Sequence, residues 1–279
     1  MLNIAVPNKG RMNKPTMELL KNAGIEPNDF DERKLCVETN YPELNLLFLR
    51  VEDIGPYVES GVADMGITGL DTIAEGRIKV EKLLDLNYGR CKLVLAGQKG
   101  KELKNGVRIS TKFINLTRDY LEAKGLEAEI TNSLGATEIK PQLGLADFIV
   151  DITSTGSTLN KNDLEVYDVL LKSNAVLIAN KDSVKTKEKN ISDIKLVLQS
   201  VLLAENKSYV MFNISNDTLS KIIGQIPCMR APTIVKTGDE SVVSVQTVVP
   251  TDEVSKIITY LKSQGTTDIL VMEIKRVVV

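Results

Sequence analysis

Short runs of consecutive apolar residues recur along the first two thirds of the chain, separated by polar stretches with apolar residues at helical spacing. These runs predict strands over residues 2–6, 46–50, 64–68, 91–96, 107–110, 128–130, 147–152 and 175–179. The intervening pattern predicts a helix that ends near Gly24, a helix that opens at residues 69–71, and helices over 52–61, 116–124 and 138–145. Strands that alternate with helices in this way indicate an α/β fold with a mainly parallel sheet.

The last quarter of the chain has a different order of elements. The pattern predicts strands over residues 209–214, 233–236, 242–249 and 269–274, and helices over 217–223 and 251–263. The order βαββαβ is that of a ferredoxin-like unit. A polar helix over residues 191–207 would connect this unit to the α/β region before it.

The length of 279 residues favours two or three folded units. We expect an α/β protein with two lobes around a cleft, like a periplasmic binding protein, followed by a C-terminal ferredoxin-like domain. The first lobe is expected over residues 1–88, completed by about 178–206. The second lobe is expected over 89–177, and the C-terminal domain over 207–279.

The composition is that of an ordinary globular protein, with 43% hydrophobic and 26% charged residues. Aromatic residues make up 4%, Trp is absent and the formal net charge is −2, so the composition does not favour nucleic-acid binding. The three cysteines form no CxxC pair, which excludes a zinc ribbon and favours a reducing compartment. Without a signal-peptide core or a run of membrane-spanning length, we expect a cytoplasmic protein with no membrane contact.

The chain contains no histidine. This excludes Ser-His-Asp and Cys-His catalysis, and it excludes zinc sites with histidine ligands. If the chain is an enzyme, acid–base chemistry falls to Asp, Glu, Lys or Tyr, or the reaction needs little of it.

The stretch DITSTGSTL, residues 151–159, has five hydroxyl side chains and a glycine directly behind a predicted buried strand. Such a loop aims backbone N–H groups and hydroxyls at one anion, and Gly156 permits a sharp turn and close approach. Asp151, at the end of the strand, is suited to hold a ribose hydroxyl or a water bound to Mg²⁺. An equally weighted alternative is a turn in which Ser and Thr only cap the following helix.

Basic residues follow the predicted strands of the first lobe. Lys9 and Arg11 lie in the turn PNKGRM, and Arg50 ends the strand LLFLR. Helix starts and the carboxyl edge of an α/β sheet both favour anion binding, although for Lys9 and Arg11 alone a solvated loop is the favoured interpretation. Asp71, in ADMGITGLD, is explained as well by helix capping as by ligand contact. For Arg33, in DERKL, a solvated charge run is the favoured interpretation from sequence alone.

Taken in order, several stretches resemble one family, ATP phosphoribosyltransferase. They are PNKGRM, FLRVEDI, ADMGITGLD, GRCKLVLA, NLTRDYL and GATEIKPQLGLADFIVDITSTGSTL. The most specific element is the spacing of Glu138, Gly144, Ala146, Ile149, Asp151, Thr155, Gly156, Thr158 and Leu159. The βαββαβ unit, with MRAPT at residues 229–233, resembles the regulatory domain of the family's long form, so the resemblance covers essentially the whole chain.

The resemblance implies the first enzyme of histidine biosynthesis, which combines ATP with 5-phosphoribosyl 1-pyrophosphate and Mg²⁺ to give N1-(5-phosphoribosyl)-ATP and pyrophosphate. The residues it implies around the sugar 5-phosphate are Thr153, Ser154, Thr155, Gly156, Ser157 and Thr158. Those implied around the ribose hydroxyls or the metal are Glu138 and Asp151. Those implied around the pyrophosphate or the ATP phosphates are Lys9, Arg11, Arg33 and Arg50, with Leu70 and Asp71 near the adenine.

This chemistry is compatible with a chain that lacks histidine. Adenine N1 carries its own lone pair, so the attack on the sugar needs positioning rather than a strong general base.

The resemblance also implies feedback inhibition by free histidine bound between C-terminal domains, and an active dimer and a hexamer. The residues implied near histidine are Asn213, Met229, Ala231, Thr233 and Asp268. Two positions depart from the family, since Ala231 stands where Ser is commoner and Asn213 stands where an acid is expected. Without that acid, a cationic group of histidine loses an ionic partner, and we expect weak or differently arranged binding.

Two interpretations without turnover remain open. Two α/β lobes around a cleft also describe a ligand-binding protein, and binding of phosphoribosyl pyrophosphate without turnover would favour it. A βαββαβ unit that senses an amino acid also describes a catalytically silent regulatory subunit. The hydroxyl-rich loop argues against the first, and the presence of Lys9, Arg11, Arg50, Glu138 and Asp151 argues against the second.

Overall fold

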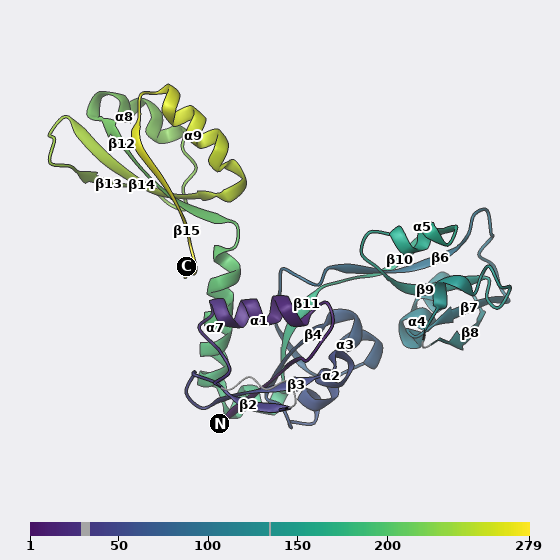
Figure 1. Cartoon of the computed structure of the whole chain (residues 1–279). Coiled ribbons are helices and arrows are strands. Elements are labelled where there is room, and N and C mark those ends of the chain that lie inside the picture. The colour runs from purple at the N-terminus through teal and green to yellow at the C-terminus, as the bar shows by residue number, and fades with distance from the viewer. Residues whose placement is uncertain (29–33, 134) are drawn as a thin grey trace. The chain divides into compact units, whose positions relative to one another are not determined.

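The computed structural model describes residues 1–28, 34–133 and 135–279. The chain folds into two compact units, Met1–Lys195 and Leu196–Val279, and Figure 1 follows their elements in chain order. The strands of the first unit are β1 (Leu2–Pro7), β2 (Cys36–Glu38), β3 (Leu44–Leu49), β4 (Met65–Gly69), β5 (Glu81–Asp85), β6 (Cys91–Gln98), β7 (Val107–Thr111), β8 (Ala128–Asn132), β9 (Phe148–Thr153), β10 (Leu164–Ser173) and β11 (Ala175–Ala179).

Short helices connect these strands. They are α1 (Asn13–Asn22), α2 (Val51–Glu59), α3 (Leu70–Gly76), α4 (Ile114–Lys124), the 3-10 helix η1 (Thr137–Ile139), α5 (Ser157–Lys161) and α6 (Lys181–Thr186). A longer helix, α7 (Glu188–Ala204), continues from the first unit into the second. Among the described helices, none combines the length and the apolar character needed to cross a membrane.

The first lobe is built on a six-stranded sheet in the order β2-β3-β1-β4-β11-β5. Strand β1 runs parallel to β3 and β4, whereas β11 is antiparallel to both of its neighbours. Because β11 lies inside this sheet, all five of its residues, AVLIA, are buried, which explains its unbroken apolar run. This strand follows the whole second lobe in the sequence, so the chain returns to complete the first lobe.

The second lobe has a five-stranded sheet with a matching arrangement, in the order β10-β6-β9-β7-β8. Strand β7 is parallel to β8 and β9, and β6 is antiparallel to β9 and β10. Each sheet therefore has three adjacent parallel strands followed by one antiparallel strand that enters from the other lobe. The predicted two-lobed α/β fold is confirmed, but the sheets are mixed rather than mainly parallel.

The second unit consists of β12 (Lys207–Ser215), α8 (Asn216–Ile222), η2 (Ile223–Gln225), β13 (Thr233–Lys236), β14 (Val242–Pro250), η3 (Thr251–Glu253), α9 (Val254–Ser263) and β15 (Thr267–Glu273). Its strands form an antiparallel sheet in the order β13-β14-β12-β15. Alternate residues of β12 and β14 are buried in a core that also holds Ile222 and Leu261 of the two helices. The ferredoxin-like prediction is thereby confirmed.

The predicted helix over residues 138–145 is wrong. Only Thr137–Ile139 form a single 3-10 turn, and the chain continues through turns. Pro141 lacks a backbone N–H group and Gly144 has a φ of 69°, so the apolar spacing of this stretch does not continue as a helix. Strands β2, β5 and β10 were not predicted from the hydrophobic pattern.

A buried carboxylate anchors the start of α7 to the first lobe. Asp64 is 6% exposed in its side chain, and both of its oxygens accept from Lys187 Nζ at 2.8 and 2.9 Å. Its oxygens also accept from Ser183 Oγ and from the backbone N–H of Asn3. Burial alone would raise the pKa of Asp64, but these hydrogen bonds and the charge of Lys187 outweigh it and lower the pKa.

Candidate active site

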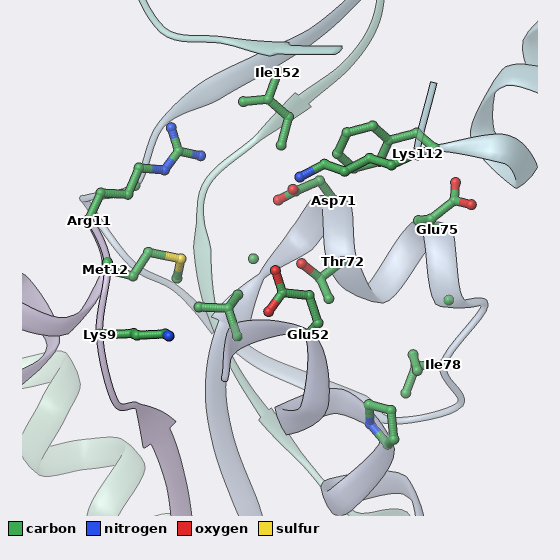
Figure 2. A pocket seen from close by; sticks show the side chains of 17 residues that line it. Lys9, Arg11, Met12, Glu52, Asp71, Thr72, Glu75, Ile78, Lys112 and Ile152 are labelled. Atoms are coloured by element: carbon green, nitrogen blue, oxygen red, sulfur yellow. The ribbon is translucent and has the colours of Figure 1, made fainter. Parts of the chain in front are cut away.

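A cavity of about 420 Å³ opens between elements of the two lobes within the first unit. From the first lobe it is lined by the turn after β1, the start of α2, and the end of β4 with α3. The second lobe contributes the residues that follow β7 and one residue of β9. Its charged and polar lining residues, shown in Figure 2, are Lys9, Arg11, Glu52, Asp71, Thr72, Glu75 and Lys112.

The turn after β1 brings two predicted basic residues to this cavity. Gly10, with a φ of 80°, allows the chain to reverse before α1. Lys9 and Arg11 are exposed, and the Lys9 side chain extends into the cavity in Figure 2. Arg11 Nη1 donates to Ser154 Oγ at 3.2 Å, across 143 residues of sequence. The basic turn of one lobe therefore meets the hydroxyl-rich loop of the other.

Asp71 lines the same cavity from the first turn of α3. It is 8% exposed, and its Oδ1 accepts from Ser173 Oγ at 2.6 Å. The residue at the helix N-cap is Gly69, so Asp71 is not the capping residue considered in the sequence analysis. Leu70 is half-buried and packs against the core of the first lobe. The structure thus brings Asp71 to the cavity and turns Leu70 to the core.

The loop of residues 153–158 connects β9 to α5. The backbone N–H of Gly156 donates to Thr153 Oγ1 at 2.8 Å, and that of Ser157 donates to Thr155 Oγ1 at 3.4 Å. Gly156 itself is the N-cap of α5 and has a φ of 77°, so no side chain caps this helix. Ser154, Ser157 and Thr158 are exposed. Thr153 and Thr155 therefore serve the turn before α5, as the capping interpretation predicts, whereas Ser154 contacts Arg11 of the other lobe.

Two carboxylates lie near the start of this loop. Asp151 is half-buried in β9, and its Oδ1 accepts from the backbone N–H of Ile152 at 2.7 Å. Burial raises the pKa of Asp151; the Ile152 hydrogen bond and the charge of Lys112 oppose this, and the charge of Glu138, in η1, adds to it. The Asp151 and Glu138 carboxylates are therefore close enough to interact electrostatically.

Of the other two predicted arginines, Arg50 and Arg33, the structure describes only Arg50. Arg50 directly follows β3, is exposed, and forms the N-cap position of α2. It immediately precedes Val51 and Glu52, which line the cavity. Arg33 lies outside the described residues.

Lys112 and Glu75 line the cavity but were not identified from the sequence. Both carboxylate oxygens of Glu75, in α3, accept backbone N–H groups at the start of α4, from Asn115 at 2.9 Å and Leu116 at 3.0 Å. These contacts join a helix of the first lobe to a helix of the second. No sequence motif marks either residue, because only the fold brings Lys112 to the cavity and Glu75 to the start of α4.

In the second unit, the structure brings together two of the five residues implied near histidine. Asn213 Nδ2 donates to Asp268 Oδ2 at 2.9 Å, and Asp268 has a φ of 51°. Thr233 begins β13, which is separated from β12 by β14. Met229 and Ala231 are exposed on the segment that leads to β13.

Comparison with known proteins agrees with both units. The family model for ATP phosphoribosyltransferase (HisG) matches residues 50–200, and the model for the HisG C-terminal domain matches residues 204–276. The ATP phosphoribosyltransferase of Ignicoccus hospitalis is 43% identical over 284 residues, covering 99% of this chain and 100% of its own length. That of Methanosarcina mazei is 41% identical over 289 residues, covering 99% of each chain.

A solved structure is similar to part of the chain. A chain of the ATP phosphoribosyl transferase (HisG:HisZ) complex from Thermotoga maritima superimposes with a TM-score of 0.64 and 32% sequence identity. The match covers 71% of this chain and 99% of the Thermotoga chain. The chain described here therefore belongs to the ATP phosphoribosyltransferase family, in the long form that carries the C-terminal HisG domain, and is a transferase of histidine biosynthesis.

Proposed function

We propose that this enzyme transfers the 5-phosphoribosyl group of 5-phosphoribosyl 1-pyrophosphate to N1 of ATP, with release of pyrophosphate. The observation that carries the proposal is the contact between Arg11, which lines the cavity, and Ser154 of the hydroxyl-rich loop. A substrate with a phosphate at one end and a pyrophosphate at the other suits two such anion-binding elements.

The loop of residues 153–158 is proposed to bind the 5-phosphate of the sugar. Gly156 has a left-handed backbone, and a side chain built at this position would meet nothing within 4 Å, so an anion can approach the loop closely. Ser154, Ser157 and Thr158 offer exposed hydroxyl donors. Asp151 is proposed to hold the ribose hydroxyls, with Glu138 beside it.

The basic residues Lys9, Arg11, Arg33 and Arg50 are proposed to surround the pyrophosphate or the ATP phosphates. In the transfer, adenine N1 forms a bond to the anomeric carbon while the bond from that carbon to pyrophosphate oxygen breaks. The bonding electrons leave with the pyrophosphate, so fixed cations stabilise the charge that develops there. Asp71, which is held by Ser173, is proposed to lie near the adenine; Leu70, which the resemblance also implies there, packs against the core of the first lobe.

The carboxylates of Asp151 and Glu138 are also suited to hold Mg²⁺. Asp151 and Glu138 interact electrostatically, and a bound divalent cation would offset the free-energy cost of burying the negative charge of Asp151. A Mg²⁺ ion held by these two carboxylates would take its remaining ligands from substrate oxygens and water. When bound, Mg²⁺ would neutralise charge on the departing pyrophosphate.

The test is an assay of the purified chain with both substrates, Mg²⁺ and a pyrophosphatase, followed by the near-ultraviolet change of N1-substituted adenine. We expect turnover, and we expect Arg11→Ala to reduce kcat/KM by about 10²–10³-fold. The control is Arg118→Ala, an exposed arginine in α4 that does not line the cavity. Binding of both substrates without product would assign the chain to the class of non-catalytic binding subunits.

Inhibition by histidine is proposed for the second unit, near Asn213, Met229, Ala231, Thr233 and Asp268. The Asn213 amide donates to one oxygen of Asp268, so the other oxygen of this carboxylate remains to receive a cationic group. We expect weak inhibition of turnover by histidine, and stronger inhibition after Asn213→Asp restores a second acid. If histidine affects neither form, the proposed regulatory site is wrong.

We also propose that the boundaries of the two catalytic lobes and the regulatory domain are those expected from the sequence. Catalytic lobe I comprises residues 1–88 and about 178–206, lobe II comprises 89–177, and the regulatory domain comprises 207–279. A dimer or hexamer is proposed from the family resemblance, and analytical ultracentrifugation with and without histidine tests it.

A further inference from the structure

Lys112 differs from the other cations of the cavity because the second lobe supplies it. It directly follows β7, and it lines the cavity with Lys9 and Arg11 from the first lobe. In Figure 2 its ammonium group extends into the cavity toward the side of Asp71. An anion bound in this cavity would therefore be approached by cations from both lobes.

The backbone around Lys112 is held on both sides. On one side, Thr111 Oγ1 donates to the carbonyl of Val150 at 2.6 Å and accepts from the backbone N–H of Phe113 at 2.9 Å. On the other side, Glu75 accepts the first N–H groups of α4 from across the cavity. Lys112 thus extends from a fixed base, which lowers the entropy cost of binding a ligand.

The charge of Lys112 acts on Asp151, but the ammonium group makes no direct ion pair among the described residues and can still bind a ligand. Its Nζ lies 5.1 Å from the centroid of the buried Phe113 ring. No carboxylate of the described residues lies within ion-pairing distance of this ammonium group. By contrast, two acids of the cavity wall already accept hydrogen bonds, Asp71 from Ser173 and Glu75 from α4. A cation on a fixed base, in a cavity that two cations of the other lobe also line, is suited to bind an anion together with them.

We propose that Lys112 is a further substrate-binding residue, whose ammonium group binds a phosphate of a substrate polyphosphate from the second lobe. The inference rests on the proposed function and deepens it. The phosphate belongs either to the triphosphate of ATP or to the pyrophosphate of 5-phosphoribosyl 1-pyrophosphate, because both carry the same chemistry. In either case the bound polyphosphate bridges cations of the two lobes.

The experiment compares the full chain with Lys112→Met, Lys112→Arg and a matched control, Lys124→Met. Methionine keeps the apolar contact with Phe113 and removes the charge. Lys124 is a suitable control because its Nζ also lies over a ring of the same lobe, 5.5 Å from the centroid of Tyr120. Lys124 is paired with Asp168 at 3.0 Å and does not line the cavity.

Affinities for ATP, for 5-phosphoribosyl 1-pyrophosphate and for inorganic pyrophosphate are measured by calorimetry, and KM and kcat by the turnover assay. We expect Lys112→Met to weaken at least one substrate by about 10- to 100-fold, the loss typical of a charge-assisted hydrogen bond. The substrate that is weakened identifies the source of the phosphate. We expect Lys112→Arg to recover most of the affinity and Lys124→Met to bind within about twofold of the wild type.

Unchanged affinity of Lys112→Met for all three ligands would overturn the inference, as would an equal loss in Lys124→Met. Thermal melting of each variant separates lost binding from lost folding. Calorimetry measures the effect of Lys112 on binding and does not depend on turnover. If the wild-type chain binds both substrates but forms no product, the proposed reaction is refuted and the inference about Lys112 is still tested.

Discussion

Asp151 combines burial with a proposed role in binding. Because burial raises its pKa in the folded chain, the folded state binds the Asp151 proton more tightly than the unfolded state does. The contribution of this group to stability is therefore present at low pH and is lost as the pH rises through the folded pKa. At neutral pH the buried anion costs stability, as residues at binding sites often do.

We expect Asp151→Asn to melt at a higher temperature than the wild type at neutral pH and to lose turnover by at least about 100-fold. Calorimetric melting and the turnover assay measure the two effects. Glu129→Gln, an exposed acid on β8 of the same lobe, is the control and should change neither. A lower melting temperature for Asp151→Asn would mean that the structure stabilises this carboxylate as an anion.

Asp64 shows the opposite behaviour. Its pKa is lowered in the folded state, so its contribution to stability is present above the unfolded pKa and is lost as the pH falls through the folded pKa. We expect Asp64→Asn to lower the free energy of unfolding by on the order of 2 kcal/mol at pH 7. This is less than the 3–5 kcal/mol typical of a fully buried pair, because Lys187 is 39% exposed.

Urea unfolding at several pH values tests this expectation. The difference between Asp64→Asn and the wild type should shrink at acid pH, where the wild-type carboxylate is also neutral. Asp182→Asn removes an exposed acid that lies 3.7 Å from Lys185 in the neighbouring helix α6, and should have little effect. A difference that stays constant with pH would contradict the ionic role of Asp64.

At the scale of elements, α3 and α4 are joined by more than one contact. Glu75 caps the first N–H groups of α4, Asn115 Nδ2 donates back to the carbonyl of Glu75 at 2.8 Å, and Arg77 Nη2 lies 2.8 Å from Asp119 Oδ1. A carboxylate at a helix N-terminus is favoured by both hydrogen bonding and the helix dipole. The start of α4 should therefore be more stable with Glu75 than without it.

We expect Glu75→Ala to speed hydrogen exchange of the Asn115 and Leu116 amides by about 10-fold, within the 0.5–2 kcal/mol typical of a lost cap. Exchange measured by NMR resolves these two amides. Arg77→Ala removes an ion pair whose side chains are mostly exposed and should have a much smaller effect. Equal exchange in Glu75→Ala and the wild type would show that α4 keeps its first turn unaided.

The elements that the sequence predicted well are those with one clear burial pattern. Strand β11 is buried on both faces, and β12 alternates strictly between buried and partly exposed positions. Strand β10 was missed because two register shifts against β6 interrupt its alternation. The false helix at residues 138–145 had apolar residues at helical spacing, but Leu143 and Leu145 are exposed and Pro141 cannot continue a helix.

The candidate site was predicted where it is contiguous in sequence. The loop of residues 153–158 stands out because its hydroxyls and glycine are neighbours in the chain. The hydrogen bond between Asp71 and Ser173 joins residues 102 positions apart, and Arg11 reaches Ser154 over 143 positions. Lys112 has no distinguishing spacing, so only the folded arrangement of the lobes reveals it.

At the scale of the whole molecule, the second unit has a hydrophobic core made of its own residues. One core of the second unit includes Phe212, Val245 and Leu261, and the lobes of the first unit have their own clusters. We expect two unfolding transitions in calorimetry, because units with separate cores need not unfold together. Each transition should respond to the ligand of its own unit.

We expect 5-phosphoribosyl 1-pyrophosphate with Mg²⁺ to raise the transition of the first unit, and histidine to raise that of the second. At a ligand concentration 100 times Kd, the expected stabilisation is about 2.7 kcal/mol. Hydrogen exchange with mass spectrometry assigns each transition to its unit. A single transition that both ligands shift equally would mean that the units unfold as one.

The position of β11 between β4 and β5 has a consequence for how the chain folds during synthesis. When residues 1–85 have left the ribosome, the strand that belongs between β4 and β5 has not yet been made, and both strands have unpaired edges. The second lobe needs only residues 91–173 for its sheet, so it can close first. The lobe that is synthesised first is thus the one completed last, and until residue 179 emerges the edges of β4 and β5 stay open to non-native pairing.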